Sequence, residues 1–188
     1  MNLKETAYWL DSIFPCSLNF AQVAGFHMAS AELGAGESLA CSVDFGEVDT
    51  GLSLTDAPDV PVRCEIFMVA RAEPKVVSAL VSAALTMLVD TNSQSTVFHA
   101  QPGTILPGMG AYGASDVMQS VSVNHGLLIA PFVWEQGVPQ VREEERLTTL
   151  CQLIPLTDDE FIHAHTYGVA ALQEALIEEN VDLMNLQR

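Results

Sequence analysis

Two apolar segments and one helix-start signal constrain the fold of this 188-residue chain most strongly. Residues 63–70 and 147–156 are short runs of mostly apolar side chains, which is typical of strands buried inside a sheet. The sequence Thr-Asp-Asp-Glu at 157–160 follows the second run directly and predicts a capping box. In such a box the Thr157 hydroxyl accepts the Glu160 amide hydrogen, and the Glu160 carboxylate accepts that of Thr157. We therefore expect two buried strands, the second of which runs straight into a helix.

Helical spacing predicts three helices. Residues 3–14 carry an apolar stripe that Pro15 ends, and Pro74 opens a second helix that runs to about Asp90. The third helix runs from the capping box to about Glu179. Because the second helix is apolar nearly all round, we expect other elements to cover it on several sides.

Other runs predict further strands, so the order of elements is mixed α and β. The sequence shows no internal repeat and no domain boundary, and we expect one domain over residues 1–188. The expected strands lie within 17–54, with a turn at 34–36, and at 96–105 and 127–134, and the expected polar loops lie at 91–95 and 142–146.

The charge balance is strongly acidic. The chain carries 24 Asp and Glu against 7 Lys and Arg, a net charge of −17, and its 49% of hydrophobic residues indicates a folded globule rather than an acidic tail. Such a field repels nucleic-acid phosphates and anionic membranes and attracts basic proteins. We therefore expect no nucleic-acid and no membrane partner. Either the acidity recruits a basic protein, or it only keeps the protein soluble.

Cysteine spacing and apolar runs indicate a reduced, cytoplasmic protein. No two cysteines have Cys-x-x-Cys spacing, and residues 1–5 lack the apolar stretch of a signal peptide. The longest apolar run, 76–89, is interrupted by Ser78, Ser82 and Thr86 and is expected to be too short to span a bilayer. The cysteines are Cys16, Cys41, Cys64 and Cys151.

Residues 108–113 match the spacing of a dinucleotide-binding glycine motif. In that motif the glycines close a strand-to-helix turn inside a parallel β-α-β unit. Here Pro107 precedes the first glycine, and residues 114–126 contain a Ser-Val-Ser-Val alternation instead of a long amphipathic helix. We therefore expect a flexible surface loop and no nucleotide cofactor.

Two histidines near the start of the last predicted helix do not form a metal site. His163 and His165 are separated by about 200° around a helix axis, so they cannot hold one metal ion from a single helix. His165 falls on an apolar stripe and is expected to be partly buried and hydrogen-bonded. Gly168 lies beside this stripe, and we expect a close-packed neighbour to explain a glycine inside a helix. Asn180 is expected to end the helix in a left-handed conformation.

The remaining histidines and cysteines leave one enzymatic alternative open. No nucleophile, phosphate-binding or metal-ligand motif is present, so the sequence predicts no catalytic residue, no cofactor-binding residue and no metal ligand. A small hydrolase or metal-dependent enzyme would need residues that converge only in the fold. Its candidates are His27, His99, His125, Cys16 and Cys41.

Aromatic and methionine side chains are candidates for a partner interface, because such residues are enriched in interface cores. Each is more often found in the core of a protein. The candidates are Trp9, Phe98, Met109, Tyr112 and Trp134. Adjacent carboxylates at 143–145 and 158–159 are explained by solvation and helix capping rather than by acid–base catalysis. The sequence does not identify which residues bind a partner.

Five short segments resemble, in the same order, segments of the suppressor-of-fused-like family, in particular of its bacterial single-domain members. The terminal Arg188 also fits an ending seen in that family. The segments are TGLS with the following DAP (50–58), RCEI (63–66), GLLIAP (126–131), LIPLTDDE (153–160) and GVAAL (168–172).

The resemblance implies an α/β domain with a mixed β-sheet flanked by helices and without catalytic residues. It also implies protein binding: full-length animal members bind transcription factors, and bacterial single-domain members have been proposed as immunity proteins that neutralise toxins. The hypothesis is a non-catalytic, cytoplasmic domain that binds a basic toxin or regulator through an acidic surface. Glu65 is expected to be a fold marker, paired with Arg63 or Arg71. A dimeric scaffold without any ligand is a third alternative, since the sequence does not fix the oligomeric state.

Overall fold

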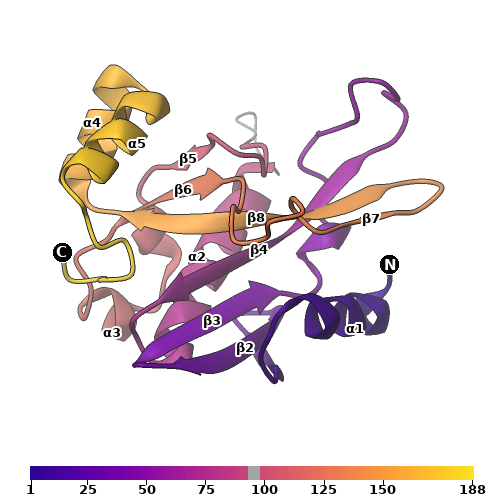
Figure 1. Cartoon of the computed structure of the whole chain (residues 1–188), viewed down its shortest axis with the longest axis horizontal. Coiled ribbons are helices and arrows are strands. Elements are labelled where there is room, and N and C mark those ends of the chain that lie inside the picture. The colour runs from indigo at the N-terminus through magenta and orange to yellow at the C-terminus, as the bar shows by residue number, and fades with distance from the viewer. Residues whose placement is uncertain (93–97) are drawn as a thin grey trace.

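The computed structural model describes residues 1–92 and 98–188, which are built around one eight-stranded sheet (Figure 1). Part of the predicted polar loop, 93–95, and the start of the predicted strand, 96–97, lie outside the described residues. The elements in chain order are α1 (Leu3–Ile13), β1 (Asn19–Val23), β2 (Phe26–Gly34), β3 (Glu37–Ser42), η1 (Phe45–Glu47), β4 (Val62–Ala70), α2 (Pro74–Asn92), β5 (Ile105–Leu106), η2 (Met109–Tyr112), α3 (Ser115–Met118), β6 (His125–Ile129), β7 (Gln140–Arg142), β8 (Leu147–Leu156), α4 (Asp158–Tyr167) and α5 (Val169–Glu178).

The two strands expected from apolar runs, β4 and β8, are neighbours at the centre of the sheet and pair in parallel. The strand order is β1-β2-β3-β4-β8-β6-β5, and β7 also pairs with β8. The remaining strand pairs are antiparallel, with β7 and β6 on successive parts of β8. The expected fold class, a mixed sheet flanked by helices, is therefore confirmed. The single-domain organisation over residues 1–188 stays a prediction.

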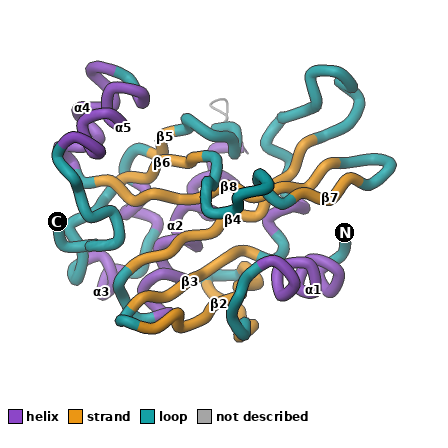
Figure 2. The backbone as a smooth tube through the Cα atoms, in the orientation of Figure 1, coloured by secondary structure: helices purple, strands orange, loops and turns teal. Residues whose placement is uncertain are grey.

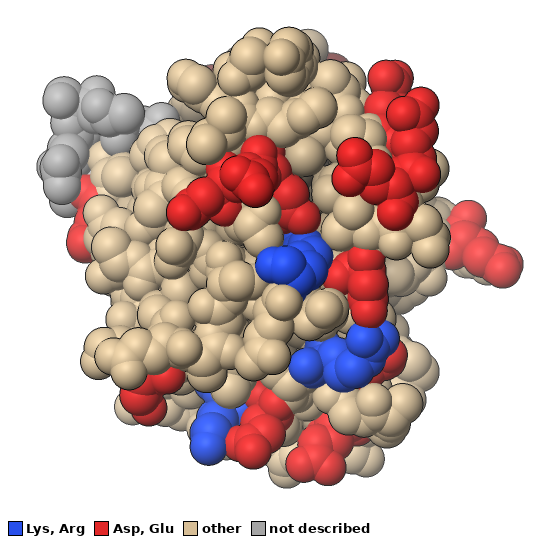
Figure 3. Space-filling model, turned by 90° about the vertical axis from the view of Figure 1, so that its left-hand side faces the viewer, with Lys and Arg blue, Asp and Glu red and all other residues tan. Residues whose placement is uncertain are grey.

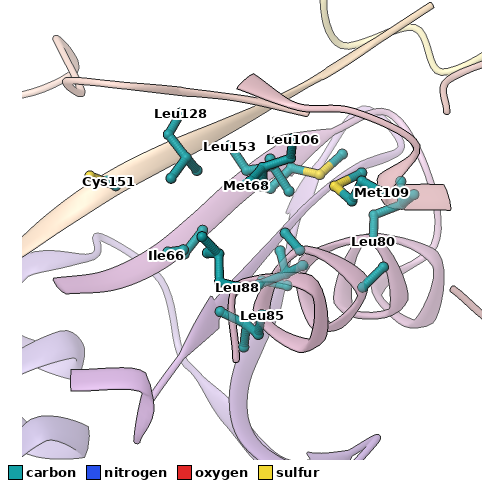
Figure 4. Close-up of a cluster of buried hydrophobic side chains, with 14 of the residues drawn as sticks. Ile66, Met68, Leu80, Leu85, Leu88, Leu106, Met109, Leu128, Cys151 and Leu153 are labelled. Carbon is teal, nitrogen blue, oxygen red and sulfur yellow. The ribbon is translucent and has the colours of Figure 1, made fainter. Parts of the chain in front are cut away.

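One face of the sheet is covered by α2 (Figure 4). Leu80, Leu85 and Leu88 of this helix are fully buried, in one cluster with Ile66 and Met68 of β4. Burying one such side chain contributes about 1.5–3 kcal/mol. The expected cover of this apolar helix is confirmed, and the layer holds the central strands in place.

By length and composition alone, α2 could cross a membrane. The expectation that the run 76–89 is too short is wrong, because the helix extends over 19 residues, from Pro74 to Asn92. Inside the protein, 67% of its most apolar window is buried. Packing against the sheet therefore accounts for the apolar composition of α2.

The opposite face of the sheet is covered at its two ends, by α1 and by the pair α4 and α5 (Figures 1 and 2). Near α1, the rings of Phe14, Phe67 and Trp134 form a cluster with centroids 5.6–5.7 Å apart. At the other end, Ala164 of α4 and Leu172 of α5 pack on side chains of β6 and β8. Each helix is thus anchored through its inner side.

The last predicted helix is two helices instead of one. Gly168 has φ 92° and ψ 163°, ends α4 and precedes α5. The expected close neighbour is wrong, because a Cβ at Gly168 would meet nothing within 4 Å. Only glycine adopts this backbone conformation readily, and that explains the residue. His165 is exposed, so its expected burial is wrong as well. The capping box at Thr157 and the left-handed Asn180 (φ 49°) are confirmed.

Two strands are shorter than the sequence indicates. In the described part of 96–105 only Ile105 is in a strand, because the chain turns at Gly103 (φ 91°). β6 ends at Ile129 rather than Trp134. Pro131 follows two residues later and has no amide hydrogen to continue a ladder.

Candidate partner-binding surface

The histidines of the enzymatic alternative do not converge. His27 lies on β2, and its Nδ1 is 2.6 Å from an Asp44 oxygen. His99 Nδ1 donates to the backbone carbonyl of Thr50. His125 accepts from the Gly108 amide (3.0 Å) through Nδ1 and bonds Asp158 (3.0 Å) through Nε2. Each histidine thus has its own structural partners.

The cysteine candidates of the enzymatic alternative are Cys16 and Cys41. All four are free, and Cys41 is fully buried in β3. Burial raises the pKa of the Cys41 thiol well above its ordinary value, which disfavours the nucleophilic thiolate. In residues 1–92 and 98–188, no three His, Cys, Asp or Glu side chains are placed to hold a metal ion.

The glycine motif at 108–113 does not form a nucleotide-binding turn. Gly108 (φ 69°) precedes the short 3-10 turn η2, and α3 beyond it has only 4 residues. Met109 of this turn is fully buried in the core, and a Cβ at Gly110 would lie 2.9 Å from the Asn124 side chain. The expected surface loop is therefore wrong for these two residues, since η2 contacts α2 and β6. Figure 4 shows Met109 beside Leu80 and Leu106 in the core.

The aromatic and methionine candidates for an interface lie mostly inside the protein. Met109 is in the core, and Trp9 and Trp134 pack partly buried beside α1. Phe98 also packs partly buried, while Tyr112 is 37% exposed. None of the five therefore exposes most of its side chain to solvent.

Within residues 1–92 and 98–188, Glu65 is the only buried carboxylate, and none of these residues forms an ion pair with it. It is 1% exposed and accepts hydrogen bonds from the Ser42 hydroxyl (2.5 Å) and from the amides of Phe45 (3.1 Å) and Gly46 (3.0 Å). The expected pairing with Arg63 or Arg71 is wrong, because both arginines bind exposed carboxylates instead.

The environment of Glu65 shifts its protonation strongly. Burial raises its pKa from 4.5 to about 7, although the bonds from Ser42, Gly46 and Phe45 favour the charged form. These bonds attach the 3-10 turn η1 to the central strand. Because the carboxyl group is enclosed, it serves this attachment and does not face a substrate.

One group of acidic residues, which begins at the last residue of η1, is held in ion pairs. We call Glu47, Asp49, Arg63, Glu143 and Arg146 the ion-paired loop end. Arg146 binds Glu143 (2.8 Å) and Glu47 (3.1 Å), and Arg63 binds Asp49 (2.9 Å). The amino terminus also binds Glu143, which together with Arg146 lowers the pKa of that carboxyl. Glu47, Asp49 and Glu143 are thus each paired with a cation of the same chain.

A second acidic group lies on the helices α4 and α5, which we call the α4–α5 hairpin. Residues 158–179 contain six carboxylates and no Lys or Arg. Figure 3 shows the side of the molecule at which the hairpin lies, where acidic side chains outnumber basic ones. The carboxylates are Asp158, Asp159, Glu160, Glu174, Glu178 and Glu179.

The α4–α5 hairpin also exposes large apolar side chains. Ile162 is 58% exposed, Tyr167 69% and Ile177 78%. Scattered exposed apolar residues are normal, but interface cores are enriched in such side chains. The hairpin therefore combines negative charge with apolar surface.

Arg188 fixes the base of this hairpin. Its guanidinium donates to both oxygens of Glu160 (2.7 and 2.9 Å) and to the Pro155 carbonyl (2.6 Å). Glu160 also completes the capping box with Thr157. The Arg188–Glu160 pair thus joins the end of β8 to the start of α4.

The sequence analysis missed the outward faces of the hairpin. The available signal was the helical period, which places Ile162 about 160° away from the buried Ala164. The contact between Arg188 and Glu160 had no local signal, because the two residues are 28 positions apart.

Comparison with solved structures identifies the fold. The chain has a TM-score of 0.70 to a crystal structure described as a suppressor-of-fused homologue from Neisseria gonorrhoeae FA 1090, at 14% identity, covering 98% of this chain and 93% of that one. It has a TM-score of 0.60 to a chain of the Sufu–Fu complex, at 11% identity, covering 96% and 84%. The resemblance stated from the sequence is thus confirmed at the level of the fold.

Comparison with curated sequences finds a distant relative. The immunity protein YqcF of Bacillus subtilis (strain 168) is 21% identical over 128 residues, which are 68% of this chain and 62% of that protein. The match therefore spans less than two thirds of that relative's length. No protein-family model matches the chain.

Proposed function

We propose that this chain, whose fold is that of suppressor-of-fused proteins, is a non-catalytic protein-binding domain of immunity or regulatory type. Its partner is a basic protein, such as a toxin or a regulator, bound through an acidic surface in the cytoplasm. Two likenesses support a protein partner: the structure of a Sufu–Fu complex and the immunity protein of Bacillus subtilis.

The observation that carries the proposal is the internal use of the few cations. In the described part of the chain, five Lys or Arg side chains lie within 4.0 Å of a carboxylate of the same chain. The chain has only 7 such side chains against 24 acidic ones. The remaining field is negative, and it accelerates and orients the approach of a basic protein. The five are Arg63, Arg71, Lys75, Arg146 and Arg188.

The proposal is tested by affinity capture from the native host across a salt series. We expect a basic protein to be retained at low salt and released as ionic strength rises, because added ions screen exposed charges. The recovered protein is then produced alone and together with this chain, and relief of a growth defect would support the immunity role.

Two results would contradict the proposal. One is that no protein is retained at low salt. The other is a partner whose binding does not change with salt, since binding through an exposed acidic surface must weaken as the Debye length shortens.

A further inference from the structure

The outer sides of α4 and α5 repeat one arrangement of side chains. On α4, Ile162 lies opposite the buried Ala164, and Asp159 precedes it by three positions. On α5, Ile177 lies far around the axis from the buried Leu172, and Glu174 precedes it by three positions. Residues three apart are neighbours on a helix surface. Each helix therefore presents one exposed isoleucine beside one exposed carboxylate.

The apolar members of this arrangement are not needed for the hairpin to pack. The hairpin is anchored to the sheet through Ala164 and Leu172, with Val169 and Leu176 packed against the same cluster. Ile177 is 78% exposed, so its side chain buries little surface in the described protein. An isoleucine there gains burial energy only when something covers it.

Tyr167 adds an amphipathic anchor at the junction of the two helices. It is 69% exposed and comes directly before Gly168, whose fixed conformation sets the angle at which the helices meet. Its ring lies 5.0 Å from that of His163, which limits its freedom. Tyrosine binds apolar groups and cations alike and is enriched among residues that dominate binding energy.

We propose that the outer sides of the α4–α5 hairpin are the docking surface for a basic, amphipathic segment of the partner protein. This inference rests on the proposed function and locates its surface. Apolar side chains of the segment cover Ile162, Tyr167 and Ile177, and its Lys or Arg side chains meet the surrounding carboxylates.

Charge decides which occupant this surface takes. Residues 158–179 contribute no cation, and Arg188 is already bound to Glu160. Two copies of the chain would bring like charges together, and like-charge juxtaposition opposes association. A basic amphipathic partner is favoured by two contributions to the binding free energy, because it neutralises the carboxylates and covers the apolar side chains.

The test uses two synthetic peptide probes of equal length and charge. One places Lys and Leu at helical spacing, and the other replaces each Leu by Ser. Binding to the full chain is measured by fluorescence anisotropy. We expect the Lys–Leu peptide to bind at least about tenfold more tightly than the Lys–Ser peptide, because covering the exposed side chains adds to the electrostatic attraction.

Matched variants locate the binding. The charge variant combines Glu174→Gln, Glu178→Gln and Glu179→Gln, and its control combines Glu135→Gln, Glu144→Gln and Glu145→Gln, which are also exposed. Both lower the net negative charge equally. We expect the hairpin variant to bind the Lys–Leu peptide about tenfold less tightly than the unaltered chain does, and the control variant to lose much less affinity.

The apolar side chains are tested in the same way. The variant Ile162→Ser with Ile177→Ser is compared with Phe132→Ser and Val133→Ser, which remove exposed apolar side chains elsewhere. We expect only the hairpin pair to abolish the preference for the Lys–Leu peptide. Thermal unfolding of each variant checks that the fold is retained.

The contradicting results separate the two proposals. Equal weakening by the two charge variants would overturn the hairpin as the docking surface but leave the basic partner standing. Failure of both peptides to bind the unaltered chain would overturn both proposals. A dimer of the chain that the Ile162→Ser and Ile177→Ser variant dissociates would show that a second copy is the occupant, and it would also overturn the inference.

Discussion

The ion-paired loop end and the α4–α5 hairpin are both acidic, but they use their carboxylates differently. At the loop end, Glu47, Asp49 and Glu143 are bound by arginines and the amino terminus. On the hairpin, Glu174 and Glu178 are exposed and make no ion pair within the described residues. The same residue type therefore stabilises the fold in one region and is available to a partner in the other. Net charge alone does not distinguish these roles.

The largest expected effect is at Glu65, which attaches the turn η1, and with it Glu47 of the ion-paired loop end, to the central strand. Replacing Glu65→Ala leaves the Ser42 hydroxyl and the Phe45 and Gly46 amides without their acceptor. Each buried unsatisfied group costs about 1–3 kcal/mol, so we expect the free energy of unfolding to fall by about 3 kcal/mol or more. Urea unfolding measures this, and Glu65→Gln, which keeps one acceptor oxygen, should fall less. A loss below that of an ordinary surface substitution would show that Glu65 does not hold η1.

The pH dependence of stability sharpens the same point. Glu65 has a folded pKa of about 7, above its ordinary value of 4.5, so between these values the folded state binds more protons than the unfolded state. Stability from this group is present below pH 4.5 and is lost as pH rises through about 7, by roughly 3 kcal/mol. As pH rises through this window, we expect the unaltered chain to lose stability that Glu65→Gln does not lose. The difference in free energy of unfolding between the two should therefore shift in favour of Glu65→Gln. A difference that is constant with pH would contradict the raised pKa.

The backbone of the hairpin provides the next test. Gly168→Ala places a side chain at φ 92° and ψ 163°, where it meets no neighbour but strains the backbone. We expect the free energy of unfolding to fall by about 1–3 kcal/mol. Ala170→Gly, within the first turn of α5, is a control for changing a small residue in the hairpin. Unchanged stability in Gly168→Ala would show that α4 and α5 can rearrange at their junction.

The smallest effects compare the two acidic regions directly. Arg146→Ala removes contacts with Glu143, Glu47 and the Met1 carbonyl, and we expect it to lower the free energy of unfolding by about 1 kcal/mol. Glu178→Gln on the hairpin should change it by less than about 0.5 kcal/mol. Chemical unfolding at low and high salt measures both. Equal decreases in the free energy of unfolding for Arg146→Ala and Glu178→Gln would contradict the claim that the two regions use their carboxylates differently.

The sequence predicted the elements whose signals are local. The two buried strands β4 and β8 came from apolar runs, although their parallel pairing was not predicted, and the capping box came from Thr157 and Glu160 three positions apart. The break at Gly168 was missed because a glycine inside a helix is only mildly unfavourable, about 1 kcal/mol, so the local pattern allowed one helix.

The partners of Glu65 were missed for a different reason. Ser42 lies 23 positions away, and Phe45 and Gly46 bind through backbone amides, which carry no side-chain signal. Exposure of the hairpin depends likewise on which sides of α4 and α5 meet the sheet. Tertiary packing decides such contacts, and a single sequence does not show it.

The most direct test of the account is an NMR titration of the isotope-labelled chain with the Lys–Leu peptide. We expect the largest amide shift changes to cluster on α4 and α5, around Ile162, Tyr167 and Ile177, while the amides of the ion-paired loop end stay nearly unchanged. Shift changes that cluster at the loop end, or that follow all exposed carboxylates equally, would contradict the claim that the two acidic regions have different roles.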